Sequence, residues 1–72
     1  MTFTELKEAL RERPEDVEQK LYNYGYSCGE RDVINFEIVQ QVFYIFNYEE
    51  AERRCYMRKI IKGFKDGSRA VR

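Results

Sequence analysis

The beginning of the chain places apolar residues at helical spacing. Phe3, Leu6 and Leu10 recur at intervals of three and four residues, so they share one face of a helix over residues 3–13. Thr2 and Glu5 have the spacing of a capping box, in which each side chain accepts a hydrogen bond from the other residue's backbone amide. The pattern therefore predicts a first helix that begins just after Thr2.

A second helix is predicted after Pro14. Proline ends a helix because it lacks an amide hydrogen, yet it suits the first turn of the next one. Gly25 is the expected end of this second helix, because glycine readily takes the left-handed conformation found there. Residues 26–32 are then a loop. The predicted apolar face consists of Val17, Leu21 and Tyr24.

The middle of the chain is rich in β-branched and aromatic residues, in the two runs 33–39 and 42–48. A two-residue turn at Gln40–Gln41 would place Ile38 opposite Phe43 and give a hairpin with one apolar face. Gln-Gln lacks the Gly or Asn that tight hairpin turns prefer. A helix is therefore the alternative, with an apolar stripe made of Ile38, Val42, Ile45 and Phe46. The hairpin is favoured because this stripe does not continue into residues 49–54.

The last predicted helix runs from Tyr48 to about Phe64. Asn47 and Glu50 have capping-box spacing at its start, and Gly63 and Gly67 mark its end. The fold class is thus α+β: two N-terminal helices, a two-stranded antiparallel hairpin and a C-terminal amphipathic helix, with mostly α as the alternative. We expect a single compact domain over residues 1–64 and a basic tail over residues 65–72.

Charge changes this picture, because it is segregated along the chain. Lys plus Arg and Asp plus Glu number 13 each, yet residues 53–72 hold eight bases and one acid. At about 100° per residue, five of the bases fall in one helical stripe. A field of one sign favours partners of the opposite sign. The stripe could instead be solvated, or face the acidic first helices within one molecule or across a homodimer. Its members are Arg54, Arg58, Lys62, Lys65 and Arg69.

Candidate chemistry is sparse. The chain has no histidine, and its two cysteines, Cys28 and Cys55, are too few for a metal site of the His/Cys type. We therefore predict no enzyme activity, no catalytic residue, no metal and no cofactor. The first residues lack the basic and apolar regions of a signal peptide, which favours a cytoplasmic protein with reduced thiols. No apolar run is long enough to cross a membrane.

Aromatic residues complete the candidate binding surface. Six Tyr and five Phe are many for 72 residues, and aromatic side chains are common in interfaces. The sequence therefore predicts a small regulator or inhibitor, of the kind that phages and mobile elements encode, which binds another protein, with an acidic surface as one option. The alternative is a nucleic-acid-binding protein that uses the basic helix. The candidate residues are the five stripe cations together with Tyr22, Tyr44, Phe46 and Tyr48.

Overall fold

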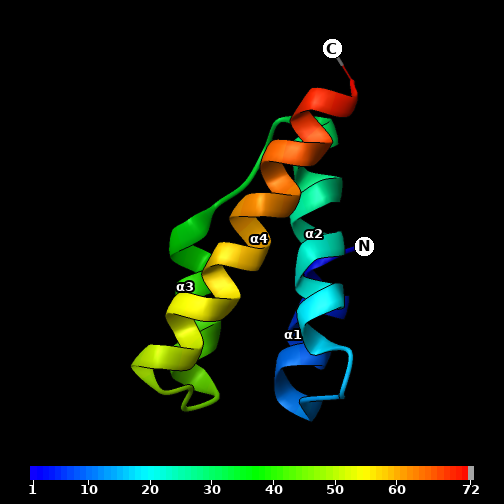
Figure 1. The fold of residues 1–72 in the computed structure, drawn as a ribbon. Helices are drawn as coiled ribbons and strands as arrows, with labels where there is room; N and C mark the ends of the chain where they lie inside the picture. The colour runs from blue at the N-terminus through cyan, green and yellow to red at the C-terminus, as the bar shows by residue number, and fades with distance from the viewer. Residues whose placement is uncertain (72) are drawn as a thin grey trace.

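In a computed structural model of the protein, the structure describes residues 1–71, and these form four helices without a strand (Figure 1). The fold is all-α. The predicted hairpin is therefore wrong, and the alternative of a mostly helical chain is confirmed. In chain order the helices are α1 (Phe3–Glu12), α2 (Val17–Arg31), α3 (Phe36–Ile45) and α4 (Glu50–Ala70).

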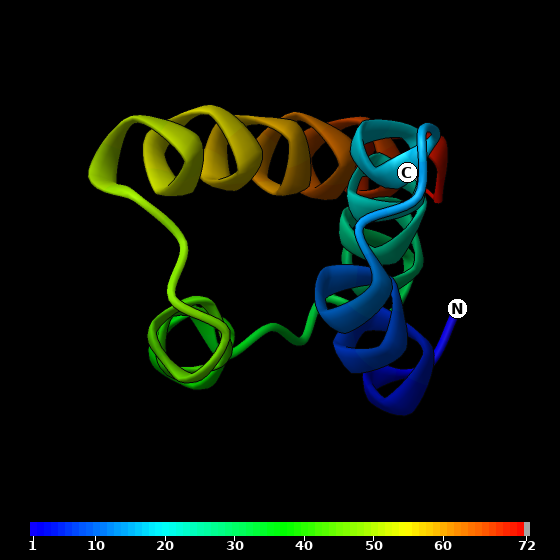
Figure 2. The ribbon, with the colours of Figure 1, turned by 90° about the horizontal axis from the view of Figure 1, so that it is seen from below.

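The longest two helices, α2 and α4, pack side by side and share the largest interface (Figure 1). Helix α1 packs against α2 and touches α3. Seen from below, α3 is viewed end-on and its ribbon stands apart from those of α1 and α2 (Figure 2). All four helices and the α3–α4 loop contribute to one core: Leu6, Leu10, Val17, Leu21, Tyr24, Cys28, Val39, Val42, Phe43, Tyr48 and Ile60.

Helix α1 confirms its prediction. The Thr2 hydroxyl accepts a hydrogen bond from the Glu5 amide at 3.2 Å, and Glu5 Oε1 accepts one from the Thr2 amide at 3.2 Å. The helix ends at Arg13, whose left-handed backbone (φ 53°) lets its amide bond the Ala9 carbonyl at 2.9 Å. The capping box therefore forms as the spacing indicates.

Helix α2 is longer than predicted. Its predicted apolar face is buried, but the helix does not end at Gly25, and most of the predicted loop over residues 26–32 is helical. The helix ends instead where Asp32 takes a left-handed backbone (φ 54°). The Asp32 amide bonds the Gly29 carbonyl and the Val33 amide bonds the Cys28 carbonyl, both at 3.1 Å, the pattern of a Schellman cap.

Helix α3 replaces the hairpin because both of its ends are capped. At the start, the Asn35 side chain accepts a hydrogen bond from the Ile38 amide at 3.2 Å. At the end, Asn47 has φ 60°, and the Tyr48 amide bonds the Phe43 carbonyl at 3.0 Å. The Phe43 and Tyr48 rings then meet at 5.5 Å, the apolar contact that completes a Schellman cap. Asn47 therefore ends α3 rather than opening the next helix.

Helix α4 begins later and ends later than predicted. Its capping box is formed by Glu49 and Glu52 rather than by Asn47 and Glu50. The helix continues past the predicted end near Phe64 to Ala70, so residues 65–70 of the predicted tail are helical. Residue 72, the last residue of the predicted tail, lies outside the described residues.

The α2–α4 interface is a contact between backbones. Gly25 and Gly29 lie on α2, and Gly63 and Gly67 lie on α4. A Cβ added at Gly63 would overlap the Tyr22 carbonyl oxygen, and one added at Gly29 would lie 2.8 Å from the amide nitrogen of Ser68. Equivalent overlaps occur at the other two positions. The two helices thus approach so closely that no side chain larger than hydrogen fits between them.

Glycine serves here by its size, because all four glycines have negative φ. Inside a helix each costs about 1 kcal/mol relative to alanine. The left-handed helix ends, which usually take glycine, are occupied by Arg13, Asp32 and Asn47. Close backbone packing must therefore outweigh a helix penalty of about 3–4 kcal/mol from the four glycines. This explains why the prediction that glycines mark helix ends is wrong.

Replacing Gly63 with alanine tests this contact. Helix propensity alone predicts that Gly63→Ala stabilises the protein by about 1 kcal/mol. The overlap with the Tyr22 carbonyl predicts the reverse, a loss of about 2–3 kcal/mol in the free energy of unfolding. Chemical denaturation followed by circular dichroism measures the difference. Lys65→Ala, at an exposed position of α4, is the control and should change stability by less than about 0.5 kcal/mol. A Gly63→Ala variant as stable as the wild type would contradict the contact.

Candidate partner-binding groove

Exposed apolar side chains are concentrated on α3 and the segment before it. Five of the six large exposed apolar side chains among the described residues lie in this region, and the sixth is Val71, just after α4. Between Val33 and Tyr48 the sequence has one charged residue, Glu37, although 36% of the whole chain is charged. The solvent-exposed surface of this region is therefore unusually apolar. The five exposed residues in this region are Val33, Phe36, Ile38, Tyr44 and Ile45.

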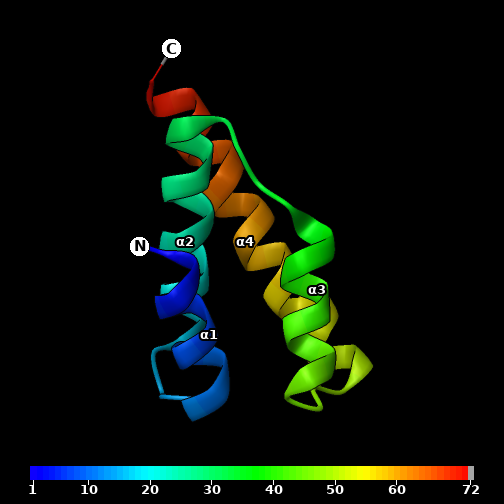
Figure 3. The same ribbon diagram turned by 180° about the vertical axis from the view of Figure 1, so that it is seen from behind.

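Helix α3 is held against the others by one face and by its two ends. Its inner face buries Val39, Val42 and Phe43. Near its start, the Phe36 ring meets that of Phe64 edge-on at 6.4 Å. An extended segment joins the helix to α2 (Figure 3). Helix α2 occupies the glycine face of α4, whereas α3 meets α4 through side chains such as the Phe43 and Tyr56 rings, whose centres are 6.4 Å apart. The outer flanks of α3 remain open.

Arg13 fixes the loop that connects α3 to α4. Its guanidinium donates to the Phe46 carbonyl at 2.7 Å and lies 4.1 Å from the centre of the Tyr48 ring. A carboxylate oxygen of Glu52 is 3.9 Å away. The end of α1 is thereby tied to the loop, so that the position of α3 does not depend on its own narrow buried face alone.

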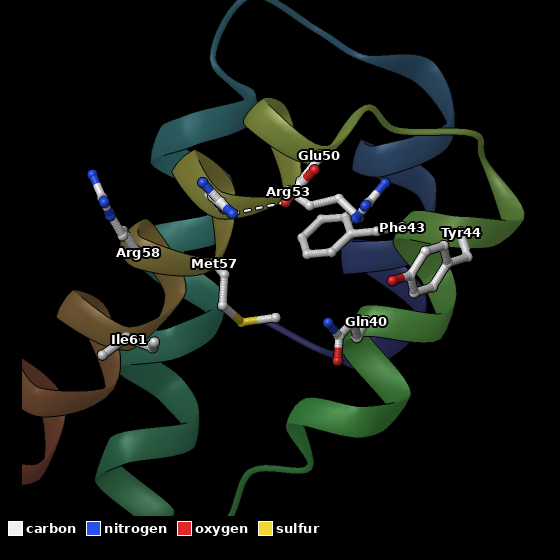
Figure 4. Close-up of a pocket in the computed structure, with 9 residues that line it drawn as sticks. Gln40, Phe43, Tyr44, Glu50, Arg53, Met57, Arg58 and Ile61 are labelled. Atoms are coloured by element: carbon white, nitrogen blue, oxygen red, sulfur yellow. Dashed lines mark hydrogen bonds and ion pairs between the residues drawn. The ribbon is translucent and has the colours of Figure 1, made fainter.

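A groove of about 390 Å³ lies between α3 and α4 (Figure 4). Its lining includes apolar side chains from both helices: Phe43 on α3, and Met57 and Ile61 on α4. Figure 4 shows the Met57 side chain extending from α4 toward Gln40 on α3. Met57 and Ile61 are four residues apart, so they follow one another along the same face of α4. The groove therefore has an apolar floor that follows α4.

The rim of the groove is basic. The Arg53 guanidinium lies 4.6 Å from the centre of the Tyr44 ring and donates to the Tyr48 carbonyl. Arg54 pairs with Glu50 at 2.7 Å, but both side chains are about 70% exposed, and such pairs contribute at most about 1 kcal/mol. Arg58 is exposed as well. Three cations thus line this groove against one acid.

The predicted cationic stripe forms on the outer face of α4. All five of its side chains are exposed. Within residues 1–71, an ion pair of 4.0 Å or less reaches only Arg54 among them. The other four surround a second hollow together with Ile61 and Asp66: Arg58, Lys62, Lys65 and Arg69. Positive charge therefore extends from the groove toward the end of α4.

The acidic start of α2 faces part of this charge. Lys59 and Lys62 share a hollow with Glu15, Asp16 and Glu18. In the part of the chain that the structure describes, these groups form no ion pair within 4.0 Å. Of the five stripe cations, only Lys62 lines this hollow. Internal neutralisation of the stripe, one of the predicted alternatives, is therefore limited to one edge.

The four predicted aromatic contact residues do not form one patch. Tyr44 is 57% exposed and lines the groove, whereas Phe46 is partly buried against the core. Tyr48 is 3% exposed, and its hydroxyl donates to the Leu10 carbonyl at 2.6 Å. Tyr22 is half-buried and donates to the Asp66 carboxylate at 2.6 Å, which belongs to the α2–α4 contact. Among the four, Tyr44 alone is exposed.

Tyrosine ionisation follows these environments. Burial, followed by the neighbouring Cys28 thiol, raises the pKa of Tyr24 to about 12. The hydrogen bond to Asp66 is the main cause that raises the pKa of Tyr22. Burial likewise raises the pKa of Tyr48. All three side chains are therefore neutral hydrogen-bonding or packing groups near pH 7.

Several groove residues were not predicted from the sequence. Arg53 lies outside the predicted stripe of five cations, and neither Met57 nor Ile61 is among the predicted binding residues. The sequence feature that indicates Met57 and Ile61 is an apolar face of α4 that is wider than one neighbouring helix can cover. The glycines form a separate strip of α4, which packs against α2. That strip is visible in the sequence as two glycine pairs, each with a spacing of four residues.

Other chemistry receives no support from the described residues. Within residues 1–71, no three His, Cys, Asp or Glu side chains gather closely enough to hold a metal ion. Cys28 is buried and Cys55 is exposed, and both are free thiols. No helix in this part of the chain combines the length and apolar character needed to cross a membrane.

Comparisons with protein-family models, with curated proteins and with solved structures found no match to this chain. The groove and its surroundings are therefore the features that indicate a function.

Two tyrosine-to-phenylalanine substitutions test the placement of the aromatic residues. Tyr48→Phe removes a buried hydrogen bond and leaves the Leu10 carbonyl without this donor, so stability should fall by about 1–2 kcal/mol. Tyr44→Phe removes an exposed hydroxyl and should change stability by less than about 0.5 kcal/mol. Thermal and chemical denaturation of both variants provide the measurement. Equal effects would show that Tyr48 is not buried as described.

Proposed function

We propose that this chain is a small non-enzymatic regulator or inhibitor that binds another protein through the groove between α3 and α4. The observation that carries the proposal is the groove itself, in which exposed Tyr44 and the partly exposed Met57 and Ile61 lie beside three arginines. Interfaces often combine an apolar centre with a polar or charged rim. Two free cysteines are compatible with work in the cytoplasm, where thiols stay reduced.

Nucleic-acid binding is the second candidate, and it is favoured by the four stripe cations that have no ion pair within 4.0 Å among residues 1–71. Single-strand binders also stack bases on exposed aromatic rings. In this protein the exposed ring nearest the cations, Tyr44, already has the Arg53 guanidinium over it. The apolar floor of the groove would also add little to phosphate binding. Protein binding therefore uses more of the observed surface.

Affinity capture from an extract of the cells that produce the protein tests the first candidate. We expect the wild type to retain a discrete protein, and Tyr44→Ala to lose it, because this side chain lines the groove and supports Arg53. Glu30→Ala, an exposed change on α2, is the matched control and should retain the same protein. Circular dichroism establishes that both variants are folded.

Two results would contradict the proposal. One is the absence of any captured protein. The other is a captured protein that Tyr44→Ala retains as well as the wild type does. Labelled DNA and RNA in a parallel binding assay address the second candidate, whose affinity would fall steeply with added salt.

A further inference from the structure

We infer that the occupant of the α3–α4 groove is an acidic amphipathic helix of a partner protein. This inference rests on the proposed function and specifies the chemistry of the partner. Apolar side chains of the helix would lie on the groove floor, and its carboxylates would lie at the basic rim.

The shape of the floor indicates a helix. Met57 and Ile61, both partly exposed, follow one another along α4. Such a floor is the surface that helix-in-groove recognition uses, with apolar side chains of the ligand at positions i, i+3 or i+4, and i+7. The exposed ring of Tyr44 extends the same surface along α3. A partner helix would therefore find anchoring contacts on both walls.

The charge of the rim indicates an acidic helix. Arg53, Arg54 and Arg58 line the groove with Glu50 as the single acid. The positive surface continues through Lys65 and Arg69, which have no ion pair within 4.0 Å among the described residues. A basic helix would meet repulsion along its whole length. Carboxylates on the partner would meet complementary charge, which accelerates association and excludes wrong partners.

A second copy of this chain does not fit that description. Its acidic helix is α1, but the apolar residues of that helix, Leu6 and Leu10, are fully buried in its own core. Its exposed apolar helix is α3, which carries a single charge, Glu37. No helix in the described part of the chain therefore presents carboxylates and an apolar stripe together. The occupant is thus a different protein.

Peptide titration followed by NMR tests the inference on the full-length protein. The probe is an 18-residue synthetic peptide with Leu at helical apolar spacing and Glu and Gln elsewhere. One matched peptide replaces every Glu with Lys, and another has the acidic composition in scrambled order. We expect the acidic amphipathic peptide to bind about tenfold more tightly than either, since several rim pairs contribute together. The shifted amide signals should come from the groove.

Charge reversal at the rim supplies the matched variants. Arg58→Glu should weaken binding of the acidic peptide by about threefold to fivefold, and added salt should weaken it further. Arg11→Glu makes the same change of charge on α1, away from the groove, and should leave the affinity within about twofold. Met57→Gln should weaken binding without a change in charge, which tests the floor separately from the rim.

The following outcomes of these experiments would overturn the inference. Equal binding of the three peptides would remove the requirement for an acidic helix. Tighter binding of a 20-nucleotide single strand or duplex, with the same signals shifted, would assign the groove to nucleic acid. Concentration-dependent shifts of the groove signals without any peptide would assign it to a second copy. A protein captured through Tyr44 together with an inactive acidic peptide would refute this inference and leave the proposed function intact.

Discussion

The close contact between α2 and α4 is the constraint on which the rest of the structure depends. Four glycines, two on each helix, allow backbone atoms to meet where side chains would normally separate the helices. A chain of 72 residues builds a thin core, and a backbone contact brings many atoms into van der Waals range without requiring large side chains. An approach this close also allows Cα–H···O contacts to carbonyl oxygens, which contribute less. The glycines therefore stabilise the fold through packing while they weaken each helix locally.

This contact also determines what remains exposed. It places α2 against one strip of α4, and α3 contributes Phe43 to the core while its Tyr44 remains exposed to solvent. The stripe of cations lies farther around α4. The same helix thus has a backbone interface, a groove wall and a basic face in succession around its circumference. The proposed binding surface is a consequence of that division.

Local signals in the sequence predicted part of this architecture. The capping box at Thr2 and the apolar face of α2 form as expected, because both depend on neighbouring residues. The hairpin was wrong because β-branched and aromatic residues suit both a strand and a buried helix face, and the caps at Asn35 and Asn47 decide between them. Strand propensity is a weak guide where tertiary packing determines burial.

The prediction that the glycines mark helix ends is wrong for a different reason. Glycine near the end of an apolar pattern usually indicates a helix end, and a single helix contains no information about a neighbour that approaches it. The need for glycine becomes visible only when two helices are considered together, as two pairs with equal spacing. For the same reason, only part of the candidate site was predicted from the sequence. The stripe of cations is a property of one helix, whereas the groove floor depends on how α3 and α4 meet.

Nuclear Overhauser contacts between the backbones of α2 and α4 are the direct test of the close approach of these two helices. The Hα protons of Gly63 should show cross-peaks to the amide proton of Tyr26, because a Cβ in that direction would lie 2.9 Å from the Tyr26 nitrogen. The Hα protons of Gly29 should show cross-peaks to the amide proton of Ser68. A uniformly labelled, monomeric sample is expected to give both. Their absence from a spectrum that contains the sequential contacts of both helices would show that the two backbones do not meet at the glycines.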